Sequence, residues 1–580
     1  MPDSWPPVRP LWSPRCGPNR ARPLLVTNVH SQEGGLSALS GGQLVVQALL
    51  TQGVERIYGV PGESYLPVLD ALHDVQDQID LVVCRHEGGA ANMADAHGKL
   101  TGQPGVCFVT RGPGATNASI GVHTAYQDST PMVLFIGQVG SDFVEREAFQ
   151  EVDYRRMFGP MTKWVAQIDR ADRVAEMVAH AFQLAVSGRP GPVVLALPED
   201  MLRSVAGSVA TRRYQVHGAA PRATDLDTLQ TMLSSGRQPV ILVGGGGWNA
   251  KACQQVTDFA EQHQIALVSS FRAQDLIDNR SKSYIGHLGI GAPKYLVDYV
   301  QNADPLFVLG ARLGEMTTNG YERVRCPVPE QPLVHVYPSP DELGRVYQAD
   351  LMIQAGMPEI AGALGTLRVP SGSERSGPLA AARQTFEVDS TPPLATDQLD
   401  LGVAIGLMQR RLPKDTIITN GAGNYSGWVH RYWSYGGFRT QLAPTSGAMG
   451  YGLPAAIAAK LTHPDRAVVC FAGDGCFLMT AQELATAVAR QLELLIVVVN
   501  NGSYGTIRMH QERDYPGRVS GTGLHNPDFA AFARAFGAHG ELVKTMAEFE
   551  PALERCLQAR GPALIELQTD VRRITSRASL

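Results

Sequence analysis

The stretch AVVCFAGDGCFLMTAQELATAVARQLELLIVVVNNGS, residues 467–503, decides the fold of the C-terminal part of this chain. Two apolar runs, Ala467–Phe471 and Leu494–Val499, have the length of buried strands, and Ala481–Gln491 between them has a helical pattern. A strand, a helix and a strand in this order form a right-handed crossover with parallel strands. We therefore predict a parallel sheet that is covered by helices on both faces.

The same stretch carries polar residues where its two strands end. Gly473-Asp474-Gly475 follows the first strand, and Asn501, 27 positions after Asp474, follows the second. Such strand ends share one sheet edge, where open α/β sheets bind ligands. A carboxylate and an amide oxygen suit Mg²⁺, and the glycines let backbone N–H groups approach a phosphate. Taken singly, Gly-Asp-Gly is also compatible with a tight turn and Asn-Asn with a helix cap.

Length and composition narrow the class of protein. The chain has 580 residues, of which 44% are hydrophobic and 18% charged, and a net charge of -5. At roughly 150 residues per domain this predicts three or four domains, and the lack of a basic excess argues against nucleic acid as a partner. Without an apolar run of about eighteen residues we expect no membrane span. The 8 cysteines form no CxxC pair, which favours buried, reduced thiols and a cytoplasmic location.

Short apolar runs alternate with helix-like stretches along the whole chain, which predicts an α/β fold of three doubly wound parallel-sheet domains. The predicted strands are Leu81–Cys84, Val106–Thr110, Met132–Ile136, Val193–Leu197, Pro239–Val243, Ala266–Ser269, Leu306–Leu309, Thr416–Thr419, Ala467–Phe471, Leu494–Val499 and Ala563–Leu567. The predicted domains are N-terminal (36–205), central (222–368) and C-terminal (395–572), with a linker at 369–394 that is rich in Ser, Gly and Pro. Residues 1–35, rich in Pro and Arg, are expected to be a flexible leader.

A second motif lies in the predicted N-terminal domain. The segment RHEGGAANMADAHGKLTGQPGVCFVTRGPGATNASIGVHTAYQDSTPMVLFIGQV, Arg85–Val139, follows a predicted strand. Together with the Asp474 and Asn501 spacing, it resembles the acetolactate synthase (large subunit) branch of the thiamine diphosphate-dependent enzymes, over roughly residues 37–570. The resemblance implies a pyrimidine-binding N-terminal domain and a diphosphate-binding C-terminal domain. It also implies that Glu87 hydrogen-bonds the pyrimidine and so promotes the tautomer that deprotonates the thiazolium carbon.

The resemblance also assigns the other cofactor contacts. Met449 matches the apolar residue that supports the bent cofactor, and the Gly447 carbonyl matches the acceptor for its amino group. Asn424 and Tyr425 stand where the family often has Gln-His. The cofactor-binding residues implied are Glu87, Gly423, Asn424, Tyr425, Gly447, Met449, Gly473, Asp474, Gly475, Cys476 and Asn501. The metal ligands implied are Asp474, Asn501 and the backbone oxygen of Ser503.

Around the reacting carbon the resemblance is less complete. Gln150, next to Phe149, and Lys163 match residues that line the entrance of acetolactate synthases, so they join Glu87 as expected catalytic residues. A core Phe and a solvated Lys are the plain alternatives. Glu63 stands where many of these enzymes have a small residue, which either narrows the pocket or adds a carboxylate to it.

The implied activity is that of a thiamine diphosphate- and Mg²⁺-dependent carboligase in branched-chain amino acid biosynthesis. It would decarboxylate a 2-oxo acid, with pyruvate as the expected donor, and condense the resulting enamine with a second 2-oxo acid. Another 2-oxo acid decarboxylase or a 2-hydroxyacyl-CoA lyase of the same family, and a catalytically silent relative, stay open as alternatives.

The resemblance carries expectations about further ligands and assembly. Gly286–Gly291 and Gly310–Arg312 match parts of the site where acetolactate synthases hold FAD, whereas the residues after Arg312 depart from it, so FAD is an open expectation. The implied partners are small 2-oxo acids and further copies of the chain, in a homodimer or homotetramer with active sites at the subunit interface. Whether a regulatory subunit takes part is left undecided.

Overall fold

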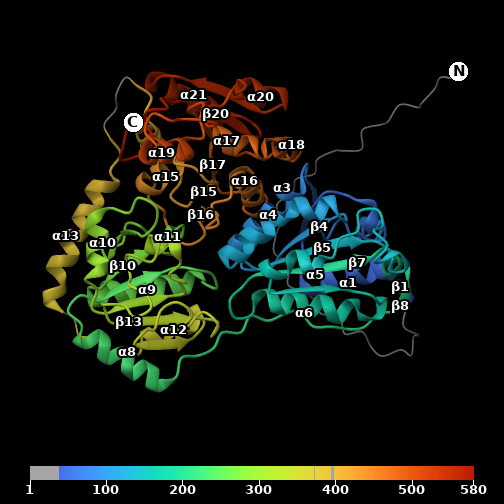
Figure 1. Cartoon of the computed structure of the whole chain (residues 1–580), viewed down its shortest axis with the longest axis horizontal. Coiled ribbons are helices and arrows are strands. Elements are labelled where there is room, and N and C mark those ends of the chain that lie inside the picture. Colours follow the sequence, from blue (N-terminus) through green and yellow to red (C-terminus); the bar gives the residue numbers. More distant parts are fainter. Residues whose placement is uncertain (1–37, 371, 394–397) are drawn as a thin grey trace. The chain divides into compact units, whose positions relative to one another are not determined.

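The computed structural model describes residues 38–370, 372–393 and 398–580, so the expected leader, 1–35, lies outside the described residues. The α/β prediction is confirmed: the described part contains three six-stranded parallel sheets, each flanked by helices (Figure 1). None of the helices in this part is long and apolar enough to cross a membrane.

The first sheet has the strand order β3-β2-β4-β5-β7-β6, and all its neighbouring strands are parallel. Its strands are β2 (Arg56–Gly59), β3 (Asp80–Val83), β4 (Gly105–Val109), β5 (Met132–Gln138), β6 (Trp164–Gln167) and β7 (Pro192–Pro198). The helices around it are α1 (Gly41–Gln52), α2 (Leu66–His73), α3 (Glu87–Thr101), α4 (Pro113–Asp128), α5 (Tyr154–Phe158), α6 (Val174–Val186) and α7 (Glu199–Arg203). A short antiparallel ribbon pairs β1 (Ala38–Ser40) with β8 (Val205–Gly207).

The second sheet, of order β11-β10-β9-β12-β13-β14, forms the central domain. Its strands are β9 (Val240–Val243), β10 (Ala266–Ser269), β11 (Tyr284–His287), β12 (Leu306–Leu309), β13 (Leu333–Tyr337) and β14 (Leu351–Gln354). Its helices are α8 (Ala223–Ser235), α9 (Ala250–His263), α10 (Lys294–Gln301), α11 (Glu315–Thr318) and α12 (Met357–Leu364). Two apolar clusters, one on each face of the sheet, make this core.

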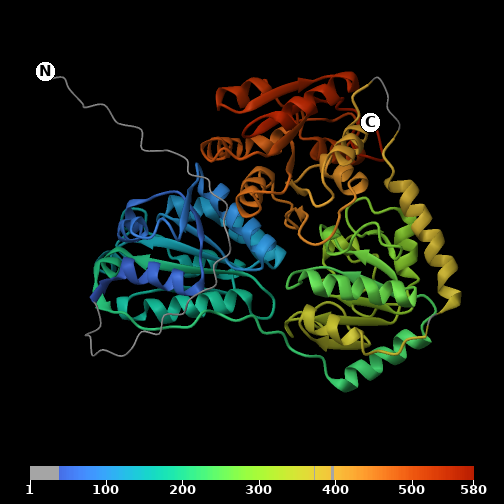
Figure 2. The ribbon, with the colours of Figure 1, turned by 180° about the vertical axis from the view of Figure 1, so that it is seen from behind.

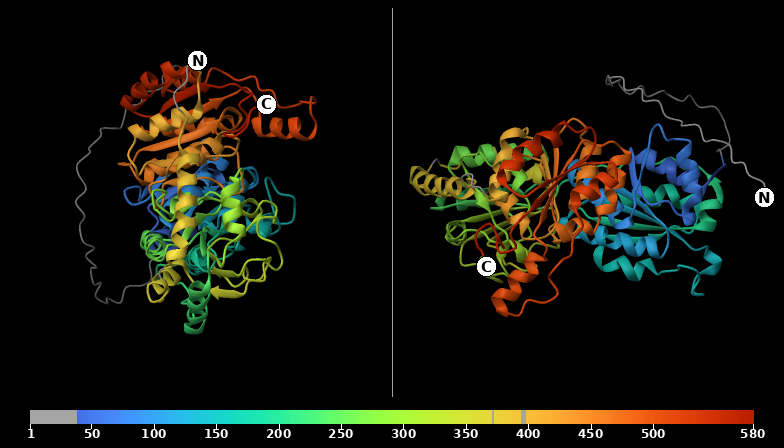
Figure 3. Two further views of the ribbon diagram at one scale, coloured as in Figure 1. Left: turned by 90° about the vertical axis from the view of Figure 1, so that its left-hand side faces the viewer. Right: turned by 90° about the horizontal axis from the view of Figure 1, so that it is seen from above.

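The third sheet has the order β16-β15-β17-β18-β20-β19. Its strands are β15 (Ile417–Asn420), β16 (Gln441–Leu442), β17 (Val468–Gly473), β18 (Leu495–Asn500), β19 (His539–Val543) and β20 (Ala563–Gln568). Its helices are α14 (Leu401–Arg411), α15 (Tyr425–Tyr432), α16 (Gly452–Thr462), α17 (Asp474–Leu478), α18 (Leu484–Ala489), α19 (Gly505–Asp514), α20 (Phe529–Ala535) and α21 (Met546–Gln558). Helix α19 projects from this domain, and none of its residues is buried (Figure 3).

Two segments differ from the helical content that their sequence suggests. Within the predicted linker, 369–394, lies helix α13 (Ser373–Ser390), which packs along β11 and α10 and reaches α15 (Figure 2). Its later part, LAAARQTFEV, is rich in residues that favour helix, namely Ala, Leu, Arg, Gln and Glu, and this outweighs Pro378 near the start. Between Asp474 and Asn501 the structure adds α17 ahead of the predicted helix. The predicted helix, Ala481–Gln491, is observed as a 3-10 turn, Ala481–Glu483, followed by α18.

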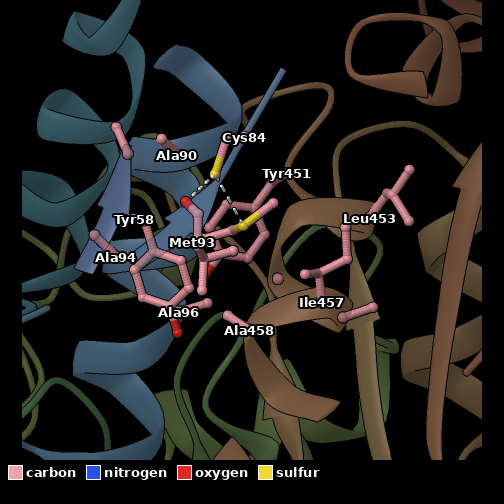
Figure 4. Close-up of a cluster of buried hydrophobic side chains, with 14 of the residues drawn as sticks. Tyr58, Cys84, Ala90, Met93, Ala94, Ala96, Tyr451, Leu453, Ile457 and Ala458 are labelled. Atoms are coloured by element: carbon pink, nitrogen blue, oxygen red, sulfur yellow. Dashed lines mark hydrogen bonds between the residues drawn. The ribbon is translucent and has the colours of Figure 1, made fainter. Parts of the chain in front are cut away.

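One apolar core joins the first and third sheets. Small residues of α3 face α16, and this close approach lets the two helices share a single cluster of buried side chains (Figure 4). On the α3 side lie Met93 and Ala94, and on the α16 side Leu453, Ile457 and Ala458. The N-terminal and C-terminal domains of the chain are therefore held together by buried apolar contact.

A buried carboxyl group ties the central domain to the third sheet. Asp275 accepts hydrogen bonds at its Oδ2 atom from the backbone N–H groups of Thr440 and Gln441, both at 3.1 Å, where β16 begins. Burial raises the pKa of Asp275 to about 6. Because the folded protein binds this proton more tightly than the unfolded chain does, stability depends on the ionisation of Asp275.

Asp275→Asn should abolish this dependence. The wild-type carboxyl stabilises the folded state most below its ordinary pKa of 3.8, and this contribution is lost as the pH rises through about 6. The wild type should therefore lose about 1 kcal/mol of its free energy of unfolding between about pH 5 and pH 7, and the variant should not lose it. Differential scanning fluorimetry at both pH values measures this through the apparent Tm. The exposed control Asp227→Asn should show no such trend, and an equal Tm offset of Asp275→Asn at both pH values would contradict the assignment.

Candidate active site

Glu87 is the first residue of α3 and lies at the carboxyl edge of the first sheet, directly after β3. His86 caps the helix, with its ring nitrogen accepting from the Gly88 N–H. The Asn117 side chain, from α4, donates to Glu87 Oε2 at 2.9 Å. A Cβ atom at Gly114 would lie 3.4 Å from Glu87 Oε1, so the absent side chain there leaves space beside this oxygen.

Glu483, from the C-terminal domain, holds the turn that leads into Glu87. Its Oε1 atom accepts from the backbone N–H groups of Arg85 and His86 at 3.0 and 2.9 Å. Glu483 is fully buried, which raises the pKa of its carboxyl, and a Cβ atom at Gly89 would collide with Oε1 at 2.5 Å. The start of α3 is therefore fixed by a carboxyl group that comes from the C-terminal domain.

Arg111, after β4, gathers three neighbouring loops at the same edge. Its Nη2 donates to Glu63 Oε1 at 2.9 Å, its Nη1 to Glu199, and its Nε to the Phe149 carbonyl at 3.2 Å. The guanidinium is nearly buried, whereas Glu63 is 65% exposed. Glu63 thus presents a carboxylate at the carboxyl edge of the first sheet, the edge that also carries Glu87. The Nε, Nη1 and Nη2 atoms of Arg111 all donate to acceptors within the protein.

The structure brings Gln150 to this edge as well. Gln150 has a φ of +66°, and its carbonyl oxygen would lie 2.7 Å from a Cβ atom at Gly112. Gly112 directly precedes α4, the helix that supplies Asn117. Gln150 and Glu87 are therefore both placed around the N-terminal part of α4.

Lys163 lies elsewhere in the described chain. It precedes β6 and so stands at the amino edge of the parallel sheet, opposite the edge that carries Glu87. Its Nζ atom donates to the Leu184 carbonyl at 2.6 Å and to the Ser187 carbonyl, at the end of α6. Burial lowers the pKa of Lys163 to about 8. In this chain Lys163 caps a helix.

Asp474 and Asn501 meet at the carboxyl edge of the third sheet. Asp474 Oδ2 accepts from the Gly502 N–H at 2.9 Å and from the Asn526 side chain at 2.8 Å, and its Oδ1 accepts from the Gly475 N–H at 2.9 Å. Asn501 Oδ1 accepts from the Ser503 N–H at 3.0 Å. Burial outweighs these hydrogen bonds and raises the pKa of Asp474. A cation at this edge would relieve the cost of burying the carboxylate.

The side chains of the turn after β15 form hydrogen bonds with other groups of the protein. The Asn424 side chain donates to the Ile574 carbonyl at 2.9 Å, and its oxygen accepts from Thr506 at 2.9 Å. The Tyr425 hydroxyl accepts from the Gly421 N–H at 3.0 Å. Cβ atoms at Gly423 and Gly473 would lie 2.9 and 3.0 Å from the Tyr425 ring. These two glycines let the backbone lie against the aromatic ring.

The remaining residues predicted to bind the cofactor are Gly447, Met449, Gly475 and Cys476. The Sγ atom of Cys476 lies 3.2 Å from the Gly450 nitrogen, and Gly475 packs under the Tyr504 ring. Gly447 is exposed with a φ of +67°, and Met449 is half-buried against the core of the third sheet. The C-terminal predictions are thus gathered on the loops that follow β15, β16, β17 and β18.

Sequence reasoning missed three residues that support the site: Asn117, Glu483 and Asn526. Glu483 lies on a turn that has no strand end to mark it, and its target comes from another domain. Asn526 lies beyond the projecting helix α19, and no spacing rule relates it to Asp474. Asn117 lies within the Arg85–Val139 segment and Glu483 within the 467–503 stretch, but neither residue was marked by its position at a strand end.

Comparisons with known proteins give matches along most of the chain. Three models match the chain: the N-terminal TPP binding domain of thiamine pyrophosphate enzymes at residues 39–157, their central domain at 226–364, and their C-terminal TPP binding domain at 421–567. The chain is 31% identical over 538 residues to the acetolactate synthase isozyme 2 large subunit of Escherichia coli (strain K12), covering 92% of this chain and 96% of that protein. It is 32% identical over 572 residues to the acetolactate synthase large subunit of Parasynechococcus marenigrum (strain WH8102), covering 94% and 90%. The chain therefore belongs to the thiamine pyrophosphate enzymes and is a thiamine pyrophosphate-dependent enzyme that resembles acetolactate synthase large subunits.

Proposed function

We propose that this enzyme is a Mg²⁺-dependent carboligase that decarboxylates a 2-oxo acid, with pyruvate as donor, and joins the remaining acyl unit to a second 2-oxo acid. Support comes from the similarity over nearly the whole chain to large subunits named acetolactate synthase. The single structural observation that carries the proposal is the placement of Glu87 and Gln150 around one end of α4. The product would belong to branched-chain amino acid biosynthesis.

The oxygen atoms at the third sheet fit a magnesium ion that also holds a diphosphate. Asp474 Oδ1, Asn501 Oδ1 and the Ser503 carbonyl each accept one hydrogen bond within the protein, which leaves a lone pair on each. Mg²⁺ binds to a small number of protein oxygens and completes its shell with phosphate and water. We assign Asp474, Asn501 and Ser503 as its ligands, and the backbone of Gly423 and Gly473 to Gly475 as the diphosphate contact.

Glu87 would hold and move a proton. Because Asn117 already donates to Oε2, the Oε1 atom beside Gly114 is the oxygen left to share a proton with a pyrimidine nitrogen. Thiamine diphosphate, when bound, supplies the nucleophilic carbon and the electron sink for decarboxylation. The Gly447 carbonyl would orient its amino group, and Met449 would support its bent shape. Glu483 keeps the Glu87 backbone in place through Arg85 and His86.

Glu63 is the residue that favours an alternative substrate. With Glu199 it places two carboxylates on one guanidinium, Arg111, so the rim near Gln150 carries an excess negative charge. Such a rim disfavours a second 2-oxo acid anion. A decarboxylase needs no second 2-oxo acid anion, so the alternative function that Glu63 favours is a 2-oxo acid decarboxylase on the same machinery. Lys163 is left out of either assignment, because its ammonium caps α6.

FAD forms a secondary part of the proposal. A cavity of about 1300 Å³ is lined by Gly245 to Gly247 after β9, by Arg272, Arg312 and Asn424, and by further residues of all three domains. The cavity is larger than ordinary ligand pockets of roughly 300–1,000 Å³, so it has room for a dinucleotide. The Nε atom of Arg272 is buried without a partner. Arg312, however, already donates to the Gln127 carbonyl at 2.9 Å, so only part of the lining fits an added ligand.

We further propose a homodimer, as the smallest assembly, in which Glu87 of one copy faces the metal ligands of the other. Large apolar side chains are exposed on the elements that carry both halves of the site. Ile120 on α4 is 41% exposed, Met479 directly after α17 is 50% exposed, and Ile507 in the first turn of α19 is 54% exposed. Exposed apolar residues gathered at a site indicate an interface.

Product identification tests the proposed reaction directly. Incubation of the enzyme with thiamine diphosphate, Mg²⁺ and pyruvate, with and without 2-oxobutyrate, should release carbon dioxide and give acetolactate and its 2-oxobutyrate adduct by mass spectrometry. Acetaldehyde as the main product would favour the decarboxylase alternative. Tight cofactor binding without carbon dioxide release from any 2-oxo acid would contradict both.

Glu87→Gln should lower turnover by at least about a hundredfold, because an amide of the same shape cannot share the proton. The variant should remain folded, since Gln can still accept from Asn117, and its circular dichroism spectrum should match that of the wild type. Glu176→Gln, at an exposed site on α6, serves as the matched control and should retain full activity. Wild-type turnover in Glu87→Gln would contradict the role assigned to this carboxyl.

A further inference from the structure

The loop between β16 and α16, residues 443–451, carries Gly447 and Met449 but contains no helix or strand. A hydrogen bond from the Gly447 N–H to the Pro444 carbonyl, at 3.0 Å, closes its first turn. Gly447 and Gly450 have φ values of +67° and +81°. A loop of this kind gains little from its own backbone bonds, so its conformation depends on the groups that hold it from outside.

The N-terminal domain holds the first half of the loop. Asp128, the last residue of α4, accepts at Oδ1 from the Thr445 N–H at 2.6 Å and also from the Thr445 hydroxyl. Lys99, near the end of α3, donates to the Ala443 carbonyl at 3.1 Å and pairs with Asp128 Oδ2. The Asp128 side chain is 1% exposed, and that of Lys99 18%. Both ends of this buried ion pair therefore bond to the loop.

Two further charged side chains near the Lys99–Asp128 ion pair also hold the loop. Asp95 lies 3.7 Å from Lys99 and accepts from the Tyr451 hydroxyl at 2.6 Å, at the far end of the loop. Arg272, from the central domain, donates to the Pro444 carbonyl and to the Gly421 carbonyl, the latter at 3.0 Å. Buried hydrogen bonds to charged groups are stronger than neutral ones and define geometry more narrowly.

We propose that Asp128, oriented by Lys99, is a positioning residue for the cofactor: through Thr445 it fixes the 443–447 turn so that the Gly447 carbonyl and Met449 are preorganised to bind. This inference rests on the cofactor contacts proposed for Gly447 and Met449. Asp128 contacts neither thiamine diphosphate nor substrate in this assignment, although it lines the large cavity described above. A site held ready by surrounding hydrogen bonds loses less conformational freedom on binding, so loosening the turn lowers cofactor affinity.

Titration calorimetry of the cofactor-free enzyme with thiamine diphosphate, at saturating Mg²⁺, tests the proposal. Thr445→Val removes one of the two bonds to Asp128 and should raise the cofactor Kd about tenfold. Thr445→Ser keeps the hydroxyl and should bind within about twofold of wild type. Asp128→Asn should weaken binding at least as much as Thr445→Val, and the Tm of the cofactor-free variant establishes that it is folded.

Thr416→Val is the matched control. Thr416 is also buried, and its hydroxyl donates to the Pro413 carbonyl at 2.6 Å, at the amino end of β15. The Thr416→Val variant should lose about as much stability as Thr445→Val without a change in cofactor Kd. This comparison separates an effect on positioning from general destabilisation. Wild-type affinity in both Thr445→Val and folded Asp128→Asn would overturn the proposal. Failure of the wild-type enzyme to bind the cofactor would instead contradict the cofactor assignments themselves.

Discussion

The contact between α3 and α16 is the interaction on which the rest of the site depends. Small side chains along α3 let α16 approach closely, so that residues of the first and third sheets form one buried apolar cluster. Helix α3 begins with Glu87, and α16 follows the loop that carries Gly447 and Met449. The packing of these two helices therefore fixes the positions of Glu87 and of the end of the 443–451 loop within one chain.

Polar groups then cross this interface in both directions. From the third sheet, Glu483 reaches the backbone of Arg85 and His86, directly before Glu87. From the first sheet, Asp128 and Lys99 reach the backbone of Thr445 and Ala443, before Gly447. Each domain thus supports the functional loop of the other. The side chains of Glu483 and Asp128 are buried, and the Lys99 side chain is 18% exposed. In such surroundings charge-assisted hydrogen bonds hold geometry well but are costly to leave unmade.

Local patterns were enough to predict the α/β class and the strand ends that carry Asp474 and Asn501, whereas Glu87 was identified through the resemblance to a family. Apolar runs such as Val106–Thr110 and Leu494–Val499 lie within one residue of β4 and β18, because buried parallel strands need continuous apolar sequence. The same rule missed β2, whose sequence RIYG begins with a charged residue. Asp474 and Asn501 were found from strand ends alone, because a parallel sheet brings such ends to one edge.

What the sequence did not reveal depends on contacts between distant segments. Lys163 matched a family position, but only the strand order shows that it stands at the amino edge, opposite Glu87. Glu483 and Asp128 lie 396 and 317 positions from the residues they support, Glu87 and Thr445, and no periodicity links such pairs. Local rules describe elements well, whereas positioning groups are defined by packing between domains.

We propose above all that Glu87 and the metal ligand Asp474 act in one site that is shared between two copies of the chain. Glu87→Gln and Asp474→Ala chains carrying different affinity tags can be produced together and the mixed dimer purified through both tags. A mixed dimer contains one site with both changes and one with neither, so it should recover about half of the wild-type turnover per dimer, although each variant alone is inactive. A mixed dimer as inactive as its parents would contradict the shared site.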